Sequence, residues 1–286
     1  MLKLIVTSSF YLVLTTAAAA SLPAFTLQDT VKTIWLYNRI PALAANTPNV
    51  FGSGYLGYVS AGLAIQNRTR VELEGKWRPD GNAATYIGLG NPHKWIGVGL
   101  VANIYGLSNK GGEKGNFGEG SIDLHFSRSI SDFIFVGIGG FNIIQHNTHS
   151  INQVRSYYFA TTSLIPIRQD NKRAFGFAYL NLGIGNGTFL PRSRALEKEL
   201  TAVNFFGGVA LQVLPEANLI LEWTGVDFTI AAGIYPIRKF PLHILFGIAD
   251  LNLDKQRLIL SLGYSLQLFQ NKRKYQNFSG NVPTAR

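Results

Sequence analysis

Apolar and polar residues alternate along residues 257–268, near the C-terminus of the chain. Successive side chains on a β-strand point to opposite faces, so this segment predicts a strand with one oily face and one mostly polar face. A strand that crosses a bilayer at a tilt needs roughly 9–11 residues, and this segment is long enough. The apolar face consists of Leu258, Leu260, Leu262, Tyr264, Leu266 and Leu268, and the other face of Arg257, Ile259, Ser261, Gly263, Ser265 and Gln267.

The same period of two residues, interrupted by turn residues, recurs along most of the chain. It is clearest in residues 121–127 and 218–223, where apolar and polar positions again alternate. The pattern predicts twelve strands, at residues 55–65, 83–90, 95–105, 118–128, 133–144, 155–165, 173–184, 202–213, 217–223, 227–235, 242–250 and 257–268.

The connections between these strands favour one architecture over another. Bacterial outer-membrane barrels alternate short periplasmic turns with longer outer loops, whereas a soluble β-sandwich, the alternative fold, gives no reason for such alternation. The pattern therefore predicts an all-β, transmembrane, antiparallel up-and-down β-barrel of about twelve strands, with both termini on the periplasmic side. The even-numbered gaps are short (91–94, 129–132, 166–172, 214–216 and 236–241), and four odd-numbered gaps are longer (66–82, 106–117, 145–154 and 185–201), while 224–226 and 251–256 are short.

The two ends of the chain differ from the strand region. Residues 1–20 combine Lys3, an apolar run and a stretch of alanines, which predicts a cleaved signal peptide of the Sec type; a membrane anchor is the alternative. Residues 21–54, with three prolines, are expected to form either a periplasmic lead or a plug inside the barrel. The barrel is assigned to residues 55–268, and residues 269–286 form a polar, basic tail.

Composition agrees with a membrane barrel. Hydrophobic residues make up 47% of the chain and charged residues only 15%, below the ~25% usual for soluble domains. No stretch after the signal peptide offers the roughly 18 apolar residues of a spanning helix. The chain has no cysteine, so an exported protein of this kind is stabilised by sheet closure and packing rather than by disulfides.

Two resemblances point the same way. Ser261, Gly263, Leu266 and Leu268 occupy the four defined positions of the assembly signal found in the last strand of bacterial outer-membrane barrels. The chain also resembles a family of uncharacterised cyanobacterial outer-membrane β-barrel-like proteins over roughly residues 49–268. That resemblance implies a Gram-negative outer-membrane barrel, and it implies no particular chemistry. The matching pieces are residues 49–54, 66–70, 80–81, 88–92, 222–227 and 246–251.

The sequence offers few candidates for catalytic residues. Ser121, Asp123 and His125 invite a hydrolase interpretation, but Ser121 and His125 would lie about 13 Å apart on one strand at ~3.3 Å per residue. A nucleophile and its base need a separation of roughly 3 Å. We expect no enzyme activity, no catalytic residues, no metal and no cofactor. The net charge of +10 comes without a basic helix or an aromatic RNA platform, so nucleic acid is not an expected partner.

Polar residues on the inward faces of the strands are candidates for lining the lumen. Glu222, Asp227, Asp250 and Arg257 are expected to form a carboxylate–arginine network, either as a filter for ions and small solutes or as structural ion pairs. Charges on the lipid face would cost roughly 2–4 kcal/mol, which favours the inward placement. The lumen-lining candidates are Asp123, His125, Asn204, Gln212, Glu222, Asp227, Asp250 and Arg257.

Basic residues gather in the turns assigned to the periplasmic side. Long-range attraction would let this basic rim contact anionic cell-wall polymer or lipid headgroups, and the alternative is a solvated rim without a partner. The rim consists of Arg168, Lys172, Arg173, Arg238, Lys239, Lys272, Arg273 and Lys274.

The expected function depends on whether the lumen is open. Inward glycines at 97, 99, 137, 139 and 263 would leave room, and Phe133, Phe135 and Phe206 would fill it if they point inward. We expect a passive, porin-like transport pore for small polar solutes or ions. A closed structural or surface-interaction barrel is the alternative, and an outer-membrane hydrolase is a distant third. Outer-membrane lipid and the barrel assembly machinery are the expected partners.

Overall fold

The computed structural model describes residues 41–69, 79–107, 119–146, 154–167, 174–191, 202–237 and 240–269. Twelve strands lie in these residues, and a short 3-10 helix η2, Gly187–Phe189, follows the seventh. The strands are β1 Tyr58–Gln66, β2 Asp80–Gly88, β3 Gly97–Tyr105, β4 Glu119–Ser131, β5 Ile134–His146, β6 Ser156–Pro166, β7 Phe177–Gly185, β8 Asn204–Leu214, β9 Ala217–Trp223, β10 Phe228–Ile234, β11 Leu242–Ala249 and β12 Arg257–Gln267.

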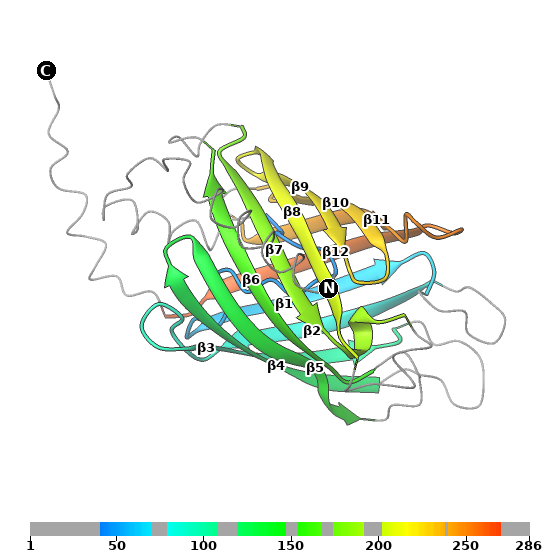
Figure 1. Cartoon of the computed structure of the whole chain (residues 1–286), viewed down its shortest axis with the longest axis horizontal. Coiled ribbons are helices and arrows are strands. Elements are labelled where there is room, and N and C mark those ends of the chain that lie inside the picture. The colour runs from blue at the N-terminus through cyan, green and yellow to red at the C-terminus, as the bar shows by residue number, and fades with distance from the viewer. Residues whose placement is uncertain are drawn as a thin grey trace, which may run out of the picture. The chain divides into compact units, whose positions relative to one another are not determined.

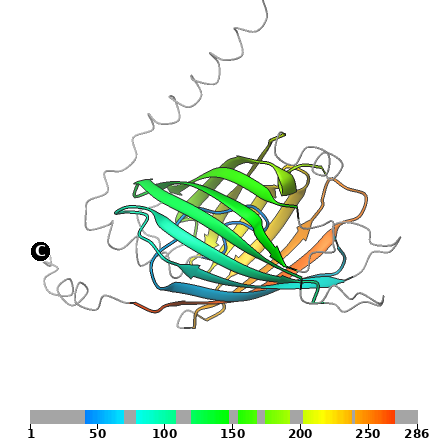
Figure 2. The same ribbon diagram turned by 90° about the horizontal axis from the view of Figure 1, so that it is seen from below.

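The strands form one closed barrel in which each strand pairs with its neighbours in sequence. All pairs are antiparallel, and the ring closes where β1 pairs with β12 from Tyr58–Gln267 to Gln66–Ile259. Figure 1 shows the tilted strands, and Figure 2 shows the barrel from below. The prediction of an all-β, twelve-stranded, antiparallel barrel is confirmed, because a β-sandwich would have open sheet edges and this sheet has none.

The first strand begins three residues later than expected. Gly54 and Gly57 have φ angles of +81° and +78°, in the left-handed region that glycine adopts without strain. The chain therefore turns through residues 55–57 instead of extending, and Tyr55 forms only an isolated parallel bridge with Gly90. Most other strand boundaries shift by one to four residues, and β9 has the bounds that were predicted.

The wall of the barrel has two different faces. Along β12, Arg257, Ile259 and Ser265 are buried, whereas Leu258, Leu262 and Leu266 are exposed on the outside. The alternation predicted for this segment is therefore confirmed. Every strand exposes at least one large apolar side chain outward, for example Leu63, Ile87, Ile104, Ile122, Ile138, Phe159, Ile184, Phe205, Leu219, Ile230, Phe246 and Leu258, in strand order.

The two ends of the barrel differ in their connections. The terminal end, where β1 begins and β12 ends, carries residues 89–96, 132–133, 167–176, 215–216 and 235–241. The loop end carries residues 67–79, 106–118, 147–155, 186–203, 224–227 and 250–256. The predicted alternation of short and long connections holds less strictly than expected, because β7 begins only at Phe177 and the gap before it is longer than 147–155.

Several predictions from the sequence lie outside the described residues. They are the signal peptide at residues 1–20, residues 21–40 of the lead or plug, and the tail from residue 270 onward. The whole basic rim lies outside as well: Arg168, Lys172, Arg173, Arg238, Lys239, Lys272, Arg273 and Lys274.

Candidate functional site

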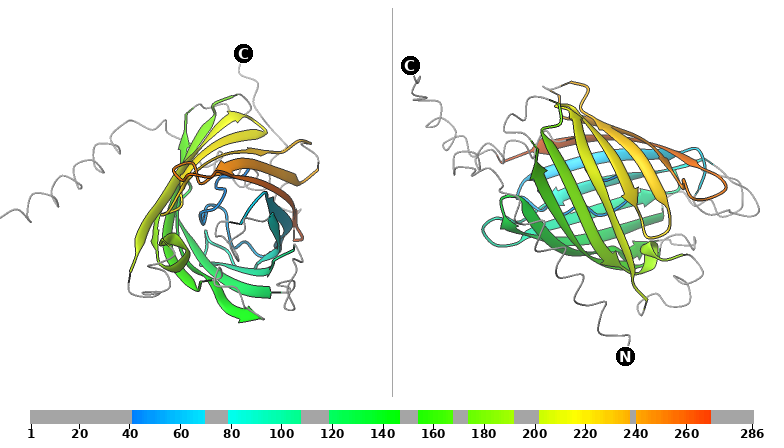
Figure 3. Two further views of the ribbon diagram at one scale, coloured as in Figure 1. Left: turned by 90° about the vertical axis from the view of Figure 1, so that its right-hand side faces the viewer. Right: turned by 45° about the horizontal axis from the view of Figure 1, so that its top comes forward.

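Residues 41–54 run through the lumen, and we call them the luminal segment. Figure 3, left, looks along the barrel and shows this blue segment inside the ring of strands. The segment contains no strand or helix. Its contacts with inward side chains move along the wall from β9 and β10, through β7 and β6, to β5, β4 and β3. The lumen is thus occupied by the chain that precedes β1.

Residues 41–48, the polar half of the segment, are held mainly by side chains that bond to their backbone. The Glu222 carboxylate accepts the N–H groups of Ala45 (3.1 Å), Asn46 (2.9 Å) and Thr47 (2.5 Å). The Asn218 amide on the same strand donates to the carbonyl oxygens of Pro41 and Ala42, at 3.0 and 3.2 Å. Further such bonds come from Asn181, whose amide donates to Thr47 Oγ1 and the Pro48 carbonyl, and from Thr229, which accepts from the Asn46 side chain.

Residues 50–54, the apolar half, are held by packing and by close backbone approach. The ring of Phe51 lies against Phe135 and Tyr179, with centroids 4.9 and 5.7 Å apart. A Cβ added to Gly137 would lie 2.7 Å from Val50 Cγ1, so a glycine is needed there for Val50 to fit. Gly54 donates to the Tyr86 hydroxyl at 2.6 Å. This half is fixed on the wall at the terminal end.

A second obstruction lies at the loop end. The connection after β7 turns inward, so that Phe189 of η2 stacks on Phe206 with ring centroids 4.3 Å apart. Phe189 also lies 6.2 Å from Phe141 and 6.4 Å from Tyr158, and it is only 2% exposed. The loop 185–201, which was predicted to be one of the long outer loops, therefore begins by folding over the lumen. Residues 192–201 of that loop lie outside the described residues.

The structure shows which of the inward glycines leave open space in the lumen and which of the three phenylalanines point into it. Added Cβ atoms at Gly97, Gly99, Gly137 and Gly139 would meet inward side chains within 3 Å, so this room is already used. At Gly263 the nearest atoms lie 3.9 Å away, and space remains. Phe135 and Phe206 are fully buried, whereas Phe133 lies in the turn between β4 and β5 and is half-buried.

Asp123 is at the centre of a hydrogen-bond network near the loop end. Its carboxylate accepts from the Asn103 amide at 2.8 Å and from the backbone N–H of Asn142 at 2.7 Å. A break in the β4–β5 register and a φ angle of 56° turn the Asn142 N–H inward. The Ser121 hydroxyl lies 3.4 Å from the same carboxylate.

Ser121 and His125, the pair behind the hydrolase interpretation, have different partners. Ser121 bonds to Asp123, whereas His125 Nδ1 lies 2.7 Å from the Tyr158 hydroxyl. A serine nucleophile is activated by a base within hydrogen-bond reach. The structure gives these two residues no such contact.

The expected carboxylate–arginine network divides into separate sites. Arg257 Nε donates to Asp250 Oδ2 at 3.1 Å, and Arg68, which the sequence analysis did not single out, lies 3.6 Å from the same oxygen. Arg257 also donates to the Gln66 side chain at 2.7 Å. The inclusion of Glu222 in this network was wrong, because its carboxylate binds backbone N–H groups of the luminal segment instead.

The remaining lumen candidates lie on or next to the inner face. Asn204 donates to the carbonyl oxygens of Phe189 and Gly225, so it holds the loop that folds over the lumen. Gln212 is buried, and its backbone carbonyl accepts from Phe175. Asp227 directly precedes β10 and is fully buried, with its backbone N–H bonded to Thr224 Oγ1.

One inward cluster has no counterpart in the sequence predictions. His243 Nε2 lies 2.6 Å from the Tyr235 hydroxyl and 2.7 Å from Ser265 Oγ. Both hydroxyls meet the same ring nitrogen. The inward positions of His243 and Ser265 follow the alternation of β11 and β12, but their pairing depends on the register between these strands, which the sequence does not state.

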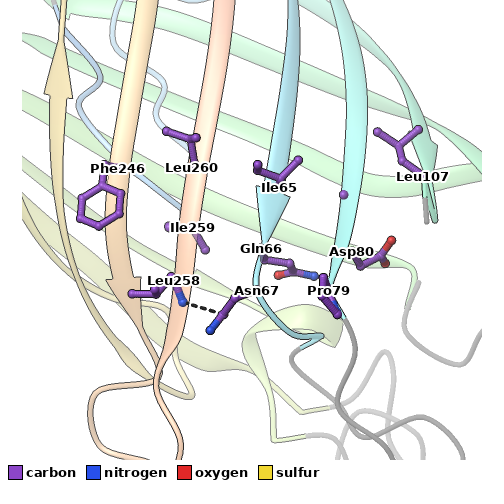
Figure 4. Close-up of a pocket in the computed structure, with 11 residues that line it drawn as sticks. Ile65, Gln66, Asn67, Pro79, Asp80, Leu107, Phe246, Leu258, Ile259 and Leu260 are labelled. Atoms are coloured by element: carbon purple, nitrogen blue, oxygen red, sulfur yellow. Dashed lines mark hydrogen bonds between the residues drawn. The ribbon is translucent and has the colours of Figure 1, made fainter.

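The outer face has a hollow of about 560 Å³ near the loop end, shown in Figure 4. Phe246, Leu260 and Ile65 lie in one row across β11, β12 and β1. The next position in that row is Gly81 on β2, which has no side chain, and the hollow opens there beside Leu107. It is part of the apolar outer surface.

Comparisons with known proteins do not assign the chain: no family model matches it, and no curated protein does. Over the described ranges, the structure contains no helix that is long and apolar enough to cross a membrane. Those ranges also hold no group of three or more His, Asp or Glu residues that could bind a metal ion.

Proposed function

We propose that the protein spans the outer membrane as a barrel and provides a passage for small polar solutes or ions, which the luminal segment closes in the state described above. One observation carries the proposal: the wall is apolar on its outer face and polar at many positions inside. Leu219 and Leu221 are exposed outward on β9, and Asn218 and Glu222 on the same strand are buried inside. A soluble barrel would gain nothing from an exposed ring of this kind, whereas a bilayer hides it.

Aromatic residues at both ends support the membrane part of the proposal. Membrane barrels carry girdles of aromatic side chains where the wall meets the two lipid–water interfaces. Exposed aromatic residues at the terminal end of this barrel include Trp95, Phe240 and Tyr264, and those at the loop end include Tyr157, Phe205 and Phe228. The last-strand pattern at Ser261, Gly263, Leu266 and Leu268 would direct insertion by the barrel assembly machinery after export.

Membrane insertion is tested by placing a charge on the outer face. Leu262 lies in the middle of β12 and is 42% exposed, and Leu253, in the loop between β11 and β12, is 41% exposed. Leu262→Lys is expected to cost roughly 2–4 kcal/mol if that position faces lipid, and Leu253→Lys almost nothing. The measurement is the fraction of refolded protein that floats with lipid vesicles. Equal flotation of the two variants, or wild-type protein that stays in the aqueous fraction, contradicts insertion.

Passage is tested by conductance across planar bilayers. Asn46→Pro removes the N–H that bonds to both oxygens of Glu222, and it should loosen the polar half without altering the wall. We expect low conductance for the wild-type protein and larger, lasting steps for the variant. Ala44→Pro, in the same segment, keeps all three N–H groups bonded to Glu222 and is the matched control.

A closed structural barrel is the second candidate function. The observation that favours it is the filling of the lumen by the luminal segment and, at the loop end, by Phe189 and Phe206. If wild-type protein and Asn46→Pro both insert into bilayers and both stay silent, the closed barrel replaces the passage.

A further inference from the structure

Glu222 is a buried carboxylate without a cationic side chain as its partner. It is 1% exposed, and within the described ranges no Lys, Arg or His is ion-paired with it. Moving a charge out of water is costly unless the charge is paired and hydrogen-bonded. Here the compensation comes from the N–H groups of Ala45, Asn46 and Thr47, which reach both carboxylate oxygens.

Three successive N–H groups directed at one anion act as a substitute for a positive charge. Concave arrangements of consecutive backbone N–H groups bind anions in the same way. A guanidinium group offers adjacent N–H donors in a plane that matches a carboxylate, and an ammonium group offers three. The luminal segment therefore presents to Glu222 the donor pattern of a small organic cation.

The surroundings of Glu222 would suit such a cation. Asn218 lies four residues away on the same inward face of β9, and Thr229 on the neighbouring strand β10 is paired with Glu222. Both use their side chains on the polar half, so both offer hydrogen-bonding groups when that half moves away. Asn46 is exposed although Thr47 beside it is buried, so solvent already reaches the residue next to the Glu222 contact.

The polar half is also the part of the luminal segment that can leave. It is held by hydrogen bonds, which water or a polar ligand can replace with bonds of the same kind. Residues 50–54 are held by ring packing and backbone contacts that a solute cannot imitate. Displacement of residues 41–48 alone would expose Glu222 and keep the segment attached.

We propose that Glu222 is a binding site for a small organic cation with adjacent N–H donors, and that residues 45–47 occupy this site in the closed state. The ligand and the polar half compete for the same carboxylate. Such a cation would open the passage and would be among the solutes that pass through it. The opening of the passage by the cation rests on the proposed function. Binding of the cation to Glu222 can be measured whether or not the protein conducts.

The test is calorimetric titration of the full-length protein in detergent with methylguanidinium chloride. Tetramethylammonium chloride, a cation without N–H groups, is the control ligand. The wild-type protein should bind weakly, because the tethered segment competes at an effective concentration in the millimolar range. Asn46→Pro should bind methylguanidinium at least tenfold more tightly than the wild type and Ala44→Pro. Adding Glu222→Gln to Asn46→Pro should remove that gain.

A second measurement needs no variant. In the wild-type protein, methylguanidinium should speed hydrogen exchange at the amides of Ala45, Asn46 and Thr47 and leave Gly54 unchanged, whereas tetramethylammonium should do neither. Binding that survives Glu222→Gln, or equal effects of the two cations, overturns the proposed site. These outcomes differ from failure of the proposed function, in which the site binds methylguanidinium but no variant conducts.

Discussion

The two halves of the luminal segment are attached to the same wall by different physical means. Residues 41–48 bond mainly through their backbone to Glu222, Asn218 and Asn181. Residues 50–54 insert Val50 and Phe51 among inward rings and place Gly54 directly against the backbone of β3. Water can replace the hydrogen bonds that hold residues 41–48, but it cannot replace the ring packing that holds residues 50–54.

This difference gives the two halves different roles: the apolar half anchors the luminal segment, and the polar half closes the lumen. The apolar half fixes the segment at the terminal end, next to the start of β1, and is expected to stay in place whenever the barrel is folded. The polar half spans the distance to β9 and is expected to open locally at a lower free energy. The difference predicts that substitutions in the two halves affect different quantities: global stability in one, local opening in the other.

Phe51→Ala should have the largest effect. Phe51 is 6% exposed and contacts the rings of Phe135 and Tyr179, and truncation of a buried phenylalanine costs about 3–5 kcal/mol. The measurement is the free energy of unfolding in detergent micelles by denaturant titration. Leu56→Ala, at a position that is 56% exposed, is the control and should cost little. Similar losses for both variants would mean that the apolar half does not anchor the segment.

Glu222→Gln tests the polar half. The variant keeps the shape and one acceptor oxygen but loses the charge, which should weaken the contact by about 1.5–3 kcal/mol. We expect the amides of Asn46 and Thr47 to exchange with solvent at least tenfold faster, and the amide of Gly54, bonded to Tyr86, to serve as an unchanged internal control. Faster exchange at Gly54 to the same degree would show that the two halves move together.

How much of this the sequence could reveal depends on the kind of contact. The strands and their faces repeat with a period of two, so twelve strands and the inward position of Glu222 could be predicted from local pattern alone. The luminal segment has no period, and Pro41 and Pro48 mark it only as neither helix nor strand. Whether it lies inside the barrel depends on partners more than 100 residues away, such as Thr162 for Val50.

Glu222 shows why the site was harder to predict than the fold. A carboxylate and an arginine in the same part of a sequence invite pairing, which led to the expected network with Arg257. Backbone N–H groups are present at almost every residue and leave no mark in the sequence, so a carboxylate that binds them cannot be distinguished from one that binds Arg257. Arg68, the second partner of Asp250, lies in the loop after β1, and only barrel closure brings it there.

Two inward glycines test how tightly the apolar half is packed, at the scale of one methyl group. Gly137→Ala would place its Cβ 2.7 Å from Val50 Cγ1 and 2.6 Å from the Phe126 carbonyl oxygen, whereas at Gly263 the nearest atoms are 3.9 Å away. Overpacking costs about 1–3 kcal/mol, so Gly137→Ala should destabilise the protein and Gly263→Ala should leave stability almost unchanged. Thermal unfolding in detergent measures both. A neutral Gly137→Ala would mean that Val50 yields easily and that the apolar half is less fixed than its contacts indicate.

The smallest expected effect concerns pH and the rings that hold the apolar half. His93, in the turn between β2 and β3, lies against Phe135 with ring centroids 5.4 Å apart, and burial lowers its pKa below 6.5 although Asp132 acts in the opposite direction. The unfolded chain then binds the proton more readily than the folded protein, so this residue reduces stability as the pH falls through 6.5 and has no effect above about pH 7.5. His93→Gln should therefore lose less thermal stability than the wild type between pH 7.5 and 5. His146→Gln, at the opposite end of the barrel, is the control substitution. If His93→Gln and the wild type decline in parallel, protonation of His93 does not weaken the anchoring rings.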